Sequence, residues 1–331
     1  MPKRVLLTAL ASILVFSTSN ALVSATGHIH GSGEQGKVAI ILASFGTTVP
    51  SAVKSITNIQ EKIKAAFPGV PVKITFTSHI IRSVWKKRQM EPQEWLDQGV
   101  PEEVLYVNNI IGTFGDLLEE GYRSIIVQPT HMFFMEQSHD LASYVNAMRS
   151  IKTIKKKWMP FTKIALGRPA LGTVGSQYEY RKDMEKALRT LTVDVQLARE
   201  RGAMLVYMAH GNDHWSTGIW AESAKMMREL YPDVITFVGG VEGYPGLDDV
   251  SRYLSRYSSG KIILKPFMIV AGDHALNDMA SDEEDSWKTV LTKQGFEVMP
   301  VLEGLGSNDA FARIFVEHIK DAAQEAGIKM N

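Results

Sequence analysis

The segment KIILKPFMIVAGDHALNDMAS, residues 261–281, decides how we interpret the fold. It opens with a continuous apolar run, KIILKPFMIV (261–270), which is typical of a strand buried on both faces of a parallel sheet. The run turns at Gly272 toward a helical pattern, and the turn carries Asp273 and His274. This order predicts a βα unit that presents a histidine at the carboxyl end of its strand.

Seven further apolar runs alternate with segments in which apolar residues recur at about every 3.6 positions. The runs are VAIILASF (38–45), VKITFTS (72–78), SIIVQPT (124–130), KIALG (163–167), AMLVYMA (203–209), VITFVGG (234–240) and FEVMPVL (296–302). Continuous Val, Ile and Leu strands that alternate with helices predict an α/β fold with doubly wound parallel sheets.

The two halves of the chain resemble each other. SIIVQPTHMFFMEQSHDLASY (124–144) matches 261–281 as a strand, a proline, an apolar run and then His and Asp, and VAIILASFGTT (38–48) matches AMLVYMAHGND (203–213). We therefore predict two similar lobes with a cleft between them. The N-terminal α/β lobe is expected over 37–168, and the C-terminal α/β lobe, carrying a metal site, over 169–331.

Composition limits the classes of function. Of the 331 residues, 45% are hydrophobic, which is enough for a large packed core. The chain has 36 basic and 36 acidic residues, so no overall field attracts nucleic acid or an anionic membrane, and any charged ligand must be met locally. It has no cysteine, so a metal must be held by histidine, carboxylate or backbone oxygen.

The N-terminus has the pattern of a cleavable signal peptide over residues 1–25. Lys3 and Arg4 precede an apolar stretch at 5–16, and small residues follow up to Ala25. The stretch is too short for a membrane-spanning helix. Residues 26–36 are Gly-rich and polar and are expected to form a flexible leader. We expect an exported, periplasmic protein without a membrane-spanning segment, and an uncleaved anchor is the alternative.

Three strand ends in the second half carry residues that can bind a metal. His210 lies in MAHGNDHW (208–215), Glu242 in GGVEGYPG (239–246), and His274 in the segment quoted first. Carboxyl ends of parallel strands meet at one edge of a sheet, so the three side chains are expected to lie close together. Two imidazoles and a carboxylate suit Co²⁺, Fe²⁺, Ni²⁺ or Zn²⁺ and leave coordination positions open. A capping or core role is the alternative for any single histidine.

These stretches resemble the anaerobic sirohydrochlorin cobaltochelatases of the CbiK type, members of the class II tetrapyrrole chelatases. The similarity extends over nearly the whole mature chain, including ILASFGT (41–47), TFTSHIIR (75–82) and QPTHMFF (128–134), and is most specific at VAGDHA (270–275). It implies a two-lobed enzyme that inserts Co²⁺, and often Fe²⁺, into sirohydrochlorin to give cobalt-sirohydrochlorin or sirohaem. It places the metal ligands at His210, Glu242 and His274.

The resemblance also implies roles beyond metal binding. His210 and His274 are the expected catalytic residues, one acting as a base once the metal transfers, and Glu136 corresponds to a catalytic acid of the family. The segment FFMEQSHDL (133–141) departs there from the expected glycine and paired acids. Sirohydrochlorin carries eight carboxylates, and Arg82 lies closest to a strand end that can meet them. His131 is a second expected cofactor-binding residue.

Other histidines leave alternatives open. His79, His131 and His139 could ligate a haem at a contact within the expected homo-oligomer, and a periplasmic metal or haem carrier without turnover is the alternative function. A metallohydrolase is disfavoured because HExxH, GxSxG and GxxxxGK[ST] are absent from the sequence. His318 lies in the last helical pattern and is expected at the surface.

Overall fold

The computed structural model describes residues 36–257 and 260–330. The predicted signal peptide and the leader up to residue 35, with His28 and His30, lie outside the described residues, so the export signal stays a prediction. None of the helices in the described part of the chain has the length and apolar character needed to cross a bilayer.

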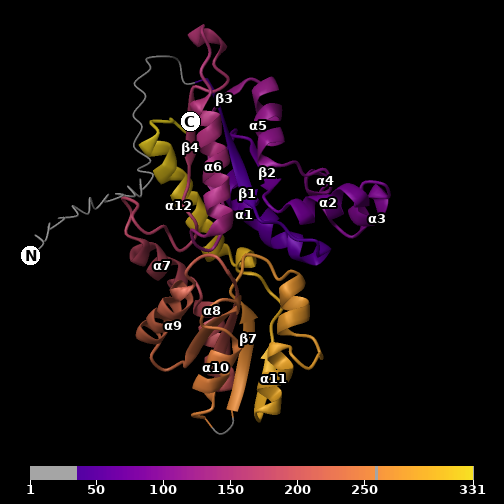
Figure 1. The fold of residues 1–331 in the computed structure, drawn as a ribbon, viewed down its shortest axis with the longest axis vertical. Helices are drawn as coiled ribbons and strands as arrows, with labels where there is room; N and C mark the ends of the chain where they lie inside the picture. Colours follow the sequence, from indigo (N-terminus) through magenta and orange to yellow (C-terminus); the bar gives the residue numbers. More distant parts are fainter. Residues whose placement is uncertain (1–35, 258–259, 331) are drawn as a thin grey trace, which may run out of the picture. The chain divides into compact units, whose positions relative to one another are not determined.

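The first half forms a four-stranded parallel sheet in the order β2-β1-β3-β4. Its strands are β1 (Lys37–Ser44), β2 (Val72–Phe76), β3 (Tyr122–Pro129) and β4 (Lys163–Leu166). The helices of this half are α1 (Val53–Ala66), α2 (His79–Arg88), α3 (Pro92–Asp97), α4 (Glu102–Leu105), α5 (Ile110–Glu119) and α6 (Glu136–Ser150). Figure 1 shows them from indigo to magenta.

The second half repeats this arrangement in a four-stranded parallel sheet of order β6-β5-β7-β8. Its strands are β5 (Ala203–Gly211), β6 (Thr236–Glu242), β7 (Gly260–Pro266) and β8 (Phe296–Pro300), and its helices are α7 (Tyr180–Arg189), α8 (Thr192–Arg201), α9 (Gly218–Leu230), α10 (Leu247–Leu254) and α11 (Trp287–Lys293). The predicted α/β class with two similar parallel-sheet halves is confirmed.

The likeness between the halves extends to single hydrogen bonds. Just beyond β3, the N–H of Thr130 donates to the carbonyl of Ala43 at 2.9 Å, and just beyond β7 the N–H of Phe267 donates to the carbonyl of Met208 at 2.7 Å. In both halves the third strand therefore ends in a proline and keeps one further bond to the first strand. This is the repeat that the two matching sequence segments predicted.

The predicted strand over 261–270 is too long at its C-terminal end. Strand β7 ends at Pro266, whose missing N–H cannot continue the ladder. The carbonyls of Met268 and Ile269 instead accept hydrogen bonds from the N–H groups of Leu305 and Gly306, at 2.8 and 2.9 Å. The apolar run is buried as expected, but its last four residues form a loop that carries the chain away from the strand toward the candidate site.

The last helix, α12 (Asp309–Glu325), returns to the first sheet, where it packs against α1, β3 and β4. Figure 1 shows this yellow helix among the elements of the first half. Its buried face includes Phe311, Phe315 and Ile319. The covering of the first sheet is therefore completed by the end of the chain.

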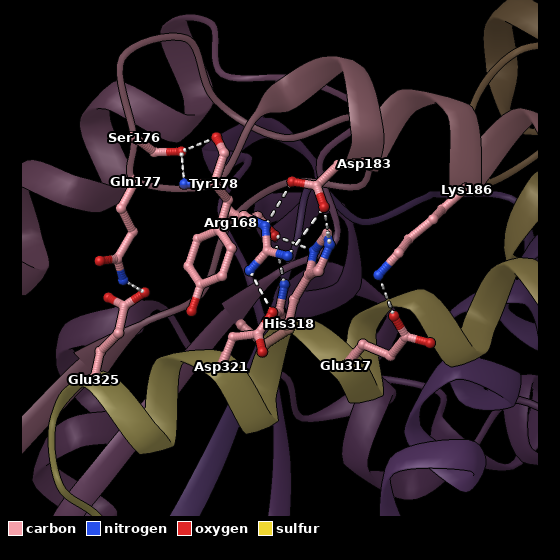
Figure 2. Close-up of polar contacts among 11 residues, drawn as sticks. Arg168, Ser176, Gln177, Tyr178, Asp183, Lys186, Glu317, His318, Asp321 and Glu325 are labelled. Carbon is pink, nitrogen blue, oxygen red and sulfur yellow. Dashed lines mark hydrogen bonds and ion pairs between the residues drawn. The ribbon is translucent and has the colours of Figure 1, made fainter.

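The expectation that His318 lies at the surface is wrong, because α12 buries it and leaves only 1% of the residue exposed. Its Nδ1–H donates to the carbonyl of Arg168 at 3.0 Å, and its Nε2 lies 3.6 Å from Oδ1 of Asp183 (Figure 2). The Arg168 guanidinium binds both oxygens of Asp183 at 2.6 and 3.0 Å, and Oδ2 of Asp321 at 2.8 Å. This polar cluster joins β4, α7 and α12.

Asp183 should make the free energy of unfolding depend on pH in the acid range. Burial alone would raise the pKa of Asp183, but the adjoining His318 and Arg168 outweigh burial and lower it to about 2, from an ordinary 3.8. A lowered carboxyl pKa stabilises the fold above the ordinary value, and this contribution is lost as the pH falls toward about 2. We expect Asp183→Asn to lower the free energy of unfolding by roughly 3 kcal/mol at neutral pH. Urea unfolding of the wild type and the variant should show that the difference in the free energy of unfolding becomes smaller in acid. A difference that does not change with pH would contradict the lowered pKa of Asp183.

Candidate active site

The candidate site begins where β5 and β6 end side by side. His210 is the second-last residue of β5, and Gly211 pairs with Glu242 across the two strands. Gly211 has φ of +88°, and a Cβ there would lie 1.8 Å from the carbonyl oxygen of Glu242. Only glycine permits this approach. The close contact brings the side chains of His210 and Glu242 to the same strand end.

The three predicted metal ligands lie together. Nδ1 of His210 is 3.9 Å from Oε2 of Glu242, and the rings of His210 and His274 are 4.7 Å apart between centroids and nearly perpendicular. Their side chains are 41%, 39% and 38% exposed, so a soluble ion can reach all three. Within residues 36–257 and 260–330, no group of three His, Asp or Glu side chains stands ready to hold a metal ion. The ligand roles therefore stay predictions.

Asp278 orients His274. A π-helix over Ala275–Met279 follows the histidine directly, and Nδ1 of His274 lies 2.6 Å from Oδ2 of Asp278. This contact assigns the ring proton to Nδ1 and leaves the Nε2 lone pair for a metal ion. The Nδ1–H of His210 likewise donates to the carbonyl of Gly211 at 3.2 Å. Sequence analysis assigned Asp278 no role, although its four-residue spacing from His274 was a usable signal.

Glu136 reaches the site from the first half of the chain. It is the first residue of α6, and its Oε2 accepts a hydrogen bond from Nδ2 of Asn212 at 3.2 Å. The Oδ1 of Asn212 accepts from the backbone N–H groups of His214 and Trp215, each at 2.8 Å. Asn212, which sequence reasoning missed, therefore connects the predicted acid to the loop that follows His210.

Aromatic side chains surround these polar groups. Phe45, 39% exposed, holds the position in the first half that His210 holds in the second, and the two rings lie 6.2 Å apart. Trp215 is also 39% exposed and lies 5.7 Å from the ring of His139 and 6.1 Å from that of Phe134. Phe45 and Phe134 of the first half and Trp215 of the second thus supply apolar surface, whereas the three predicted metal ligands all belong to the second half.

Arg82 and His131 make other contacts. Nη1 of Arg82 donates to the carbonyls of Phe76 and Thr77, which closes the end of β2. His131 is buried with its Nδ1 2.8 Å from Oγ of Ser138, and burial lowers its pKa to about 4, so the ring is neutral at physiological pH. Their cofactor-binding roles stay predictions.

Comparison with known proteins identifies the family. The sequence profile of the cobalt chelatase (CbiK) family matches residues 38–324, which is most of the chain. The chain belongs to this family. The predicted ligands His210, Glu242 and His274 of this cobalt chelatase family member lie inside the matched region, as do both sheets apart from Lys37, the first residue of β1.

Two curated relatives and one solved structure agree with this membership. The chain is 28% identical over 292 residues to the sirohydrochlorin cobaltochelatase of Salmonella typhimurium, covering 88% of this chain and 98% of the relative. It is 27% identical over 286 residues to the sirohydrochlorin cobaltochelatase CbiKC of Nitratidesulfovibrio vulgaris, covering 86% and 90%. SirB from Bacillus subtilis with Fe3+ shares the fold at a TM-score of 0.55 and 14% identity, covering 89% and 100%.

Replacing Asp278 should lower the affinity of this cobalt chelatase family member for its metal ion without unfolding the protein. Asp278→Asn replaces the carboxylate that holds Nδ1–H of His274 with a neutral amide, and loss of such a carboxylate partner costs about 10- to 100-fold in metal affinity. Titration with Co²⁺ and the metal KM measure the effect. Asp273→Asn is the matched control, because the Asp273 carboxylate accepts from Asn277 at 3.0 Å on the same turn and, within the described residues, has no hydrogen bond to a histidine. Equal losses in both variants would contradict an orienting role.

Proposed function

We propose that this protein inserts Co²⁺, with Fe²⁺ as an accepted alternative, into sirohydrochlorin. The observation that carries the proposal is the meeting of His210, Glu242 and His274 at one open strand end of a cobalt chelatase family member. Two curated relatives that match most of the chain are named as sirohydrochlorin cobaltochelatases, which supports the same substrate here.

The metal ion is a substrate in this reaction and must be held only briefly. Two neutral imidazoles and a carboxylate bind a borderline divalent ion and leave coordination positions for the ring nitrogens. Those nitrogens displace the ligands in turn, and two pyrrole protons leave as the ion enters the ring. Once the metal has transferred, the freed His210 or His274 accepts one proton at its Nε2, and Glu136 accepts the other.

The macrocycle must be held and bent while this happens, because a flat ring hides its nitrogen lone pairs. Phe45 offers apolar surface beside His210 and Trp215 offers it beside His139, and binding to the ring periphery can offset the strain. Arg82 uses only Nη1 in its contacts with the end of β2, which leaves its other nitrogens for a substrate carboxylate. We assign Arg82 to that role.

His274→Ala tests the proposal directly. We expect insertion of Co²⁺ and Fe²⁺ to fall by at least ~10²–10⁴-fold, the usual range for one positioned acid-base group, because this side chain also serves as a ligand. The measurement is the absorbance change of sirohydrochlorin with each metal, and circular dichroism should show an unchanged fold.

His214→Ala is the matched control, since His214 is exposed and engages the site only through its backbone N–H. Unchanged insertion by His274→Ala would remove the metal-site assignment. Metal or haem spectra without formation of the metallated ring by the wild-type protein would favour the carrier function instead. The same spectra reveal any co-purified haem by its Soret band.

We further propose that the protein acts in the periplasm, because residues 1–25 carry the basic, apolar and small-residue pattern of a cleavable signal. The sequence of the N-terminus of protein isolated from a periplasmic fraction checks this. Processing near Ala25 is the expected result, and a chain that begins at Met1 would contradict it.

A further inference from the structure

The segment between α6 and β4 combines positive charge with apolar side chains, and the proposed function does not use it. Residues 151–159, IKTIKKKWM, contain four lysines and no acid. We name this segment the lysine loop. Its basic and large apolar residues that matter here are Ile151, Lys152, Ile154, Lys155, Lys156, Lys157 and Trp158.

The apolar side chains of the lysine loop face solvent. Ile154 is fully exposed, Trp158 is 66% exposed and Ile151 is 39% exposed. Within the part of the chain that the structure describes, none of the four lysines forms an ion pair, and all four are exposed. Single exposed apolar residues are ordinary. Three of them among four unpaired cations form a surface that is apolar at its tips and basic around them.

The lysine loop is a turn held by its own hydrogen bonds. Oγ1 of Thr153 donates to the carbonyl of Lys155 at 2.8 Å, and the N–H of Trp158 donates to the same carbonyl at 2.9 Å. Nζ of Lys157 lies 5.0 Å from the centroid of the Trp158 ring. The chain becomes buried again only at Phe161, which is 7% exposed. These bonds hold the apolar tips outward on a hydrogen-bonded turn.

The lysine loop lies at the far end of α6 from the candidate site. Glu136 begins α6 beside Asn212, and Ser150 ends it, which is about 22 Å along the helix axis. Figure 1 shows the segment between α6 and β4 extending beyond the end of α6. A surface bound by this loop would therefore leave the strand ends that carry the histidines uncovered.

We propose that the lysine loop docks the protein on an anionic phospholipid surface. The lysines attract headgroup phosphates, each adding roughly fivefold to binding, and Ile154 and Trp158 enter the boundary between headgroups and acyl chains. The chain is neutral overall, so this attraction is local to the loop. A lipid surface accepts protruding apolar tips without a shaped partner, whereas an acidic protein would need a matching pocket for them. The proposal does not depend on the chelatase reaction.

Sedimentation of the whole mature protein with vesicles tests this. We expect binding to vesicles of phosphatidylcholine with phosphatidylglycerol, loss of binding in high salt, and none to phosphatidylcholine alone. Lys155→Gln with Lys156→Gln should weaken binding roughly 30-fold, and Ile154→Ser with Trp158→Ser about tenfold. Lys261→Gln with Lys293→Gln, two exposed lysines of the second half, is the charge-matched control and should bind as the wild type does.

Three results would overturn the proposal. They are equal binding to both kinds of vesicle, binding to anionic vesicles that the loop variants leave unchanged, and salt-sensitive binding to an acidic protein without binding to vesicles. Chelatase activity in solution should be unchanged in every loop variant, which shows that the fold is intact and separates failure of docking from failure of the reaction.

Discussion

The close approach of Gly211 to the carbonyl of Glu242 is the constraint on which the site depends. It lets two neighbouring parallel strands end at the same level, so that His210 and Glu242 leave the sheet together. The loop after β7 then adds His274, whose ring is fixed by Asp278. A side chain at position 211 would move His210 away from Glu242, and the three side chains could then not lie together with His274.

The two halves have the same strand order but carry different side chains at the equivalent turns. Gly46 and Gly211 both have positive φ at the equivalent turn, with values of +97° and +88°. The residue before this glycine is Phe45 in one half and His210 in the other. One copy of the unit therefore has an aromatic ring at this strand end, while the other has an imidazole there. A duplicated fold can thus present two kinds of side chain, because its two strand-end edges carry different residues.

Burial of charge ties the end of the chain to this frame. Arg168 follows β4 and binds Asp183 on α7 and Asp321 on α12, while His318 on α12 closes the cluster. Loss of one partner from a buried ion pair strongly destabilises a fold, because the other charge is left buried and uncompensated. The cluster therefore favours the one arrangement in which α12 returns to the first sheet and the two halves remain joined through α7.

Much of this could be read from the sequence. Apolar runs predicted all eight strands of the described residues, since burial on both faces demands continuous Val, Ile and Leu. Strand ends predicted the grouping of His210, Glu242 and His274. The end of β7 was missed because a buried loop and a buried strand have the same apolar composition. Pro266 was the available sign of the difference.

The sequence by itself determined the α/β class, the internal repeat and the residue types at the site, because these follow from local periodicity and from the chemistry of single side chains. Tertiary structure alone decided that α12 covers the first sheet, that His318 is buried, and that Asn212 meets Glu136. Each of these joins residues far apart along the chain. Such contacts depend on how whole elements pack, and no short window of sequence contains both partners.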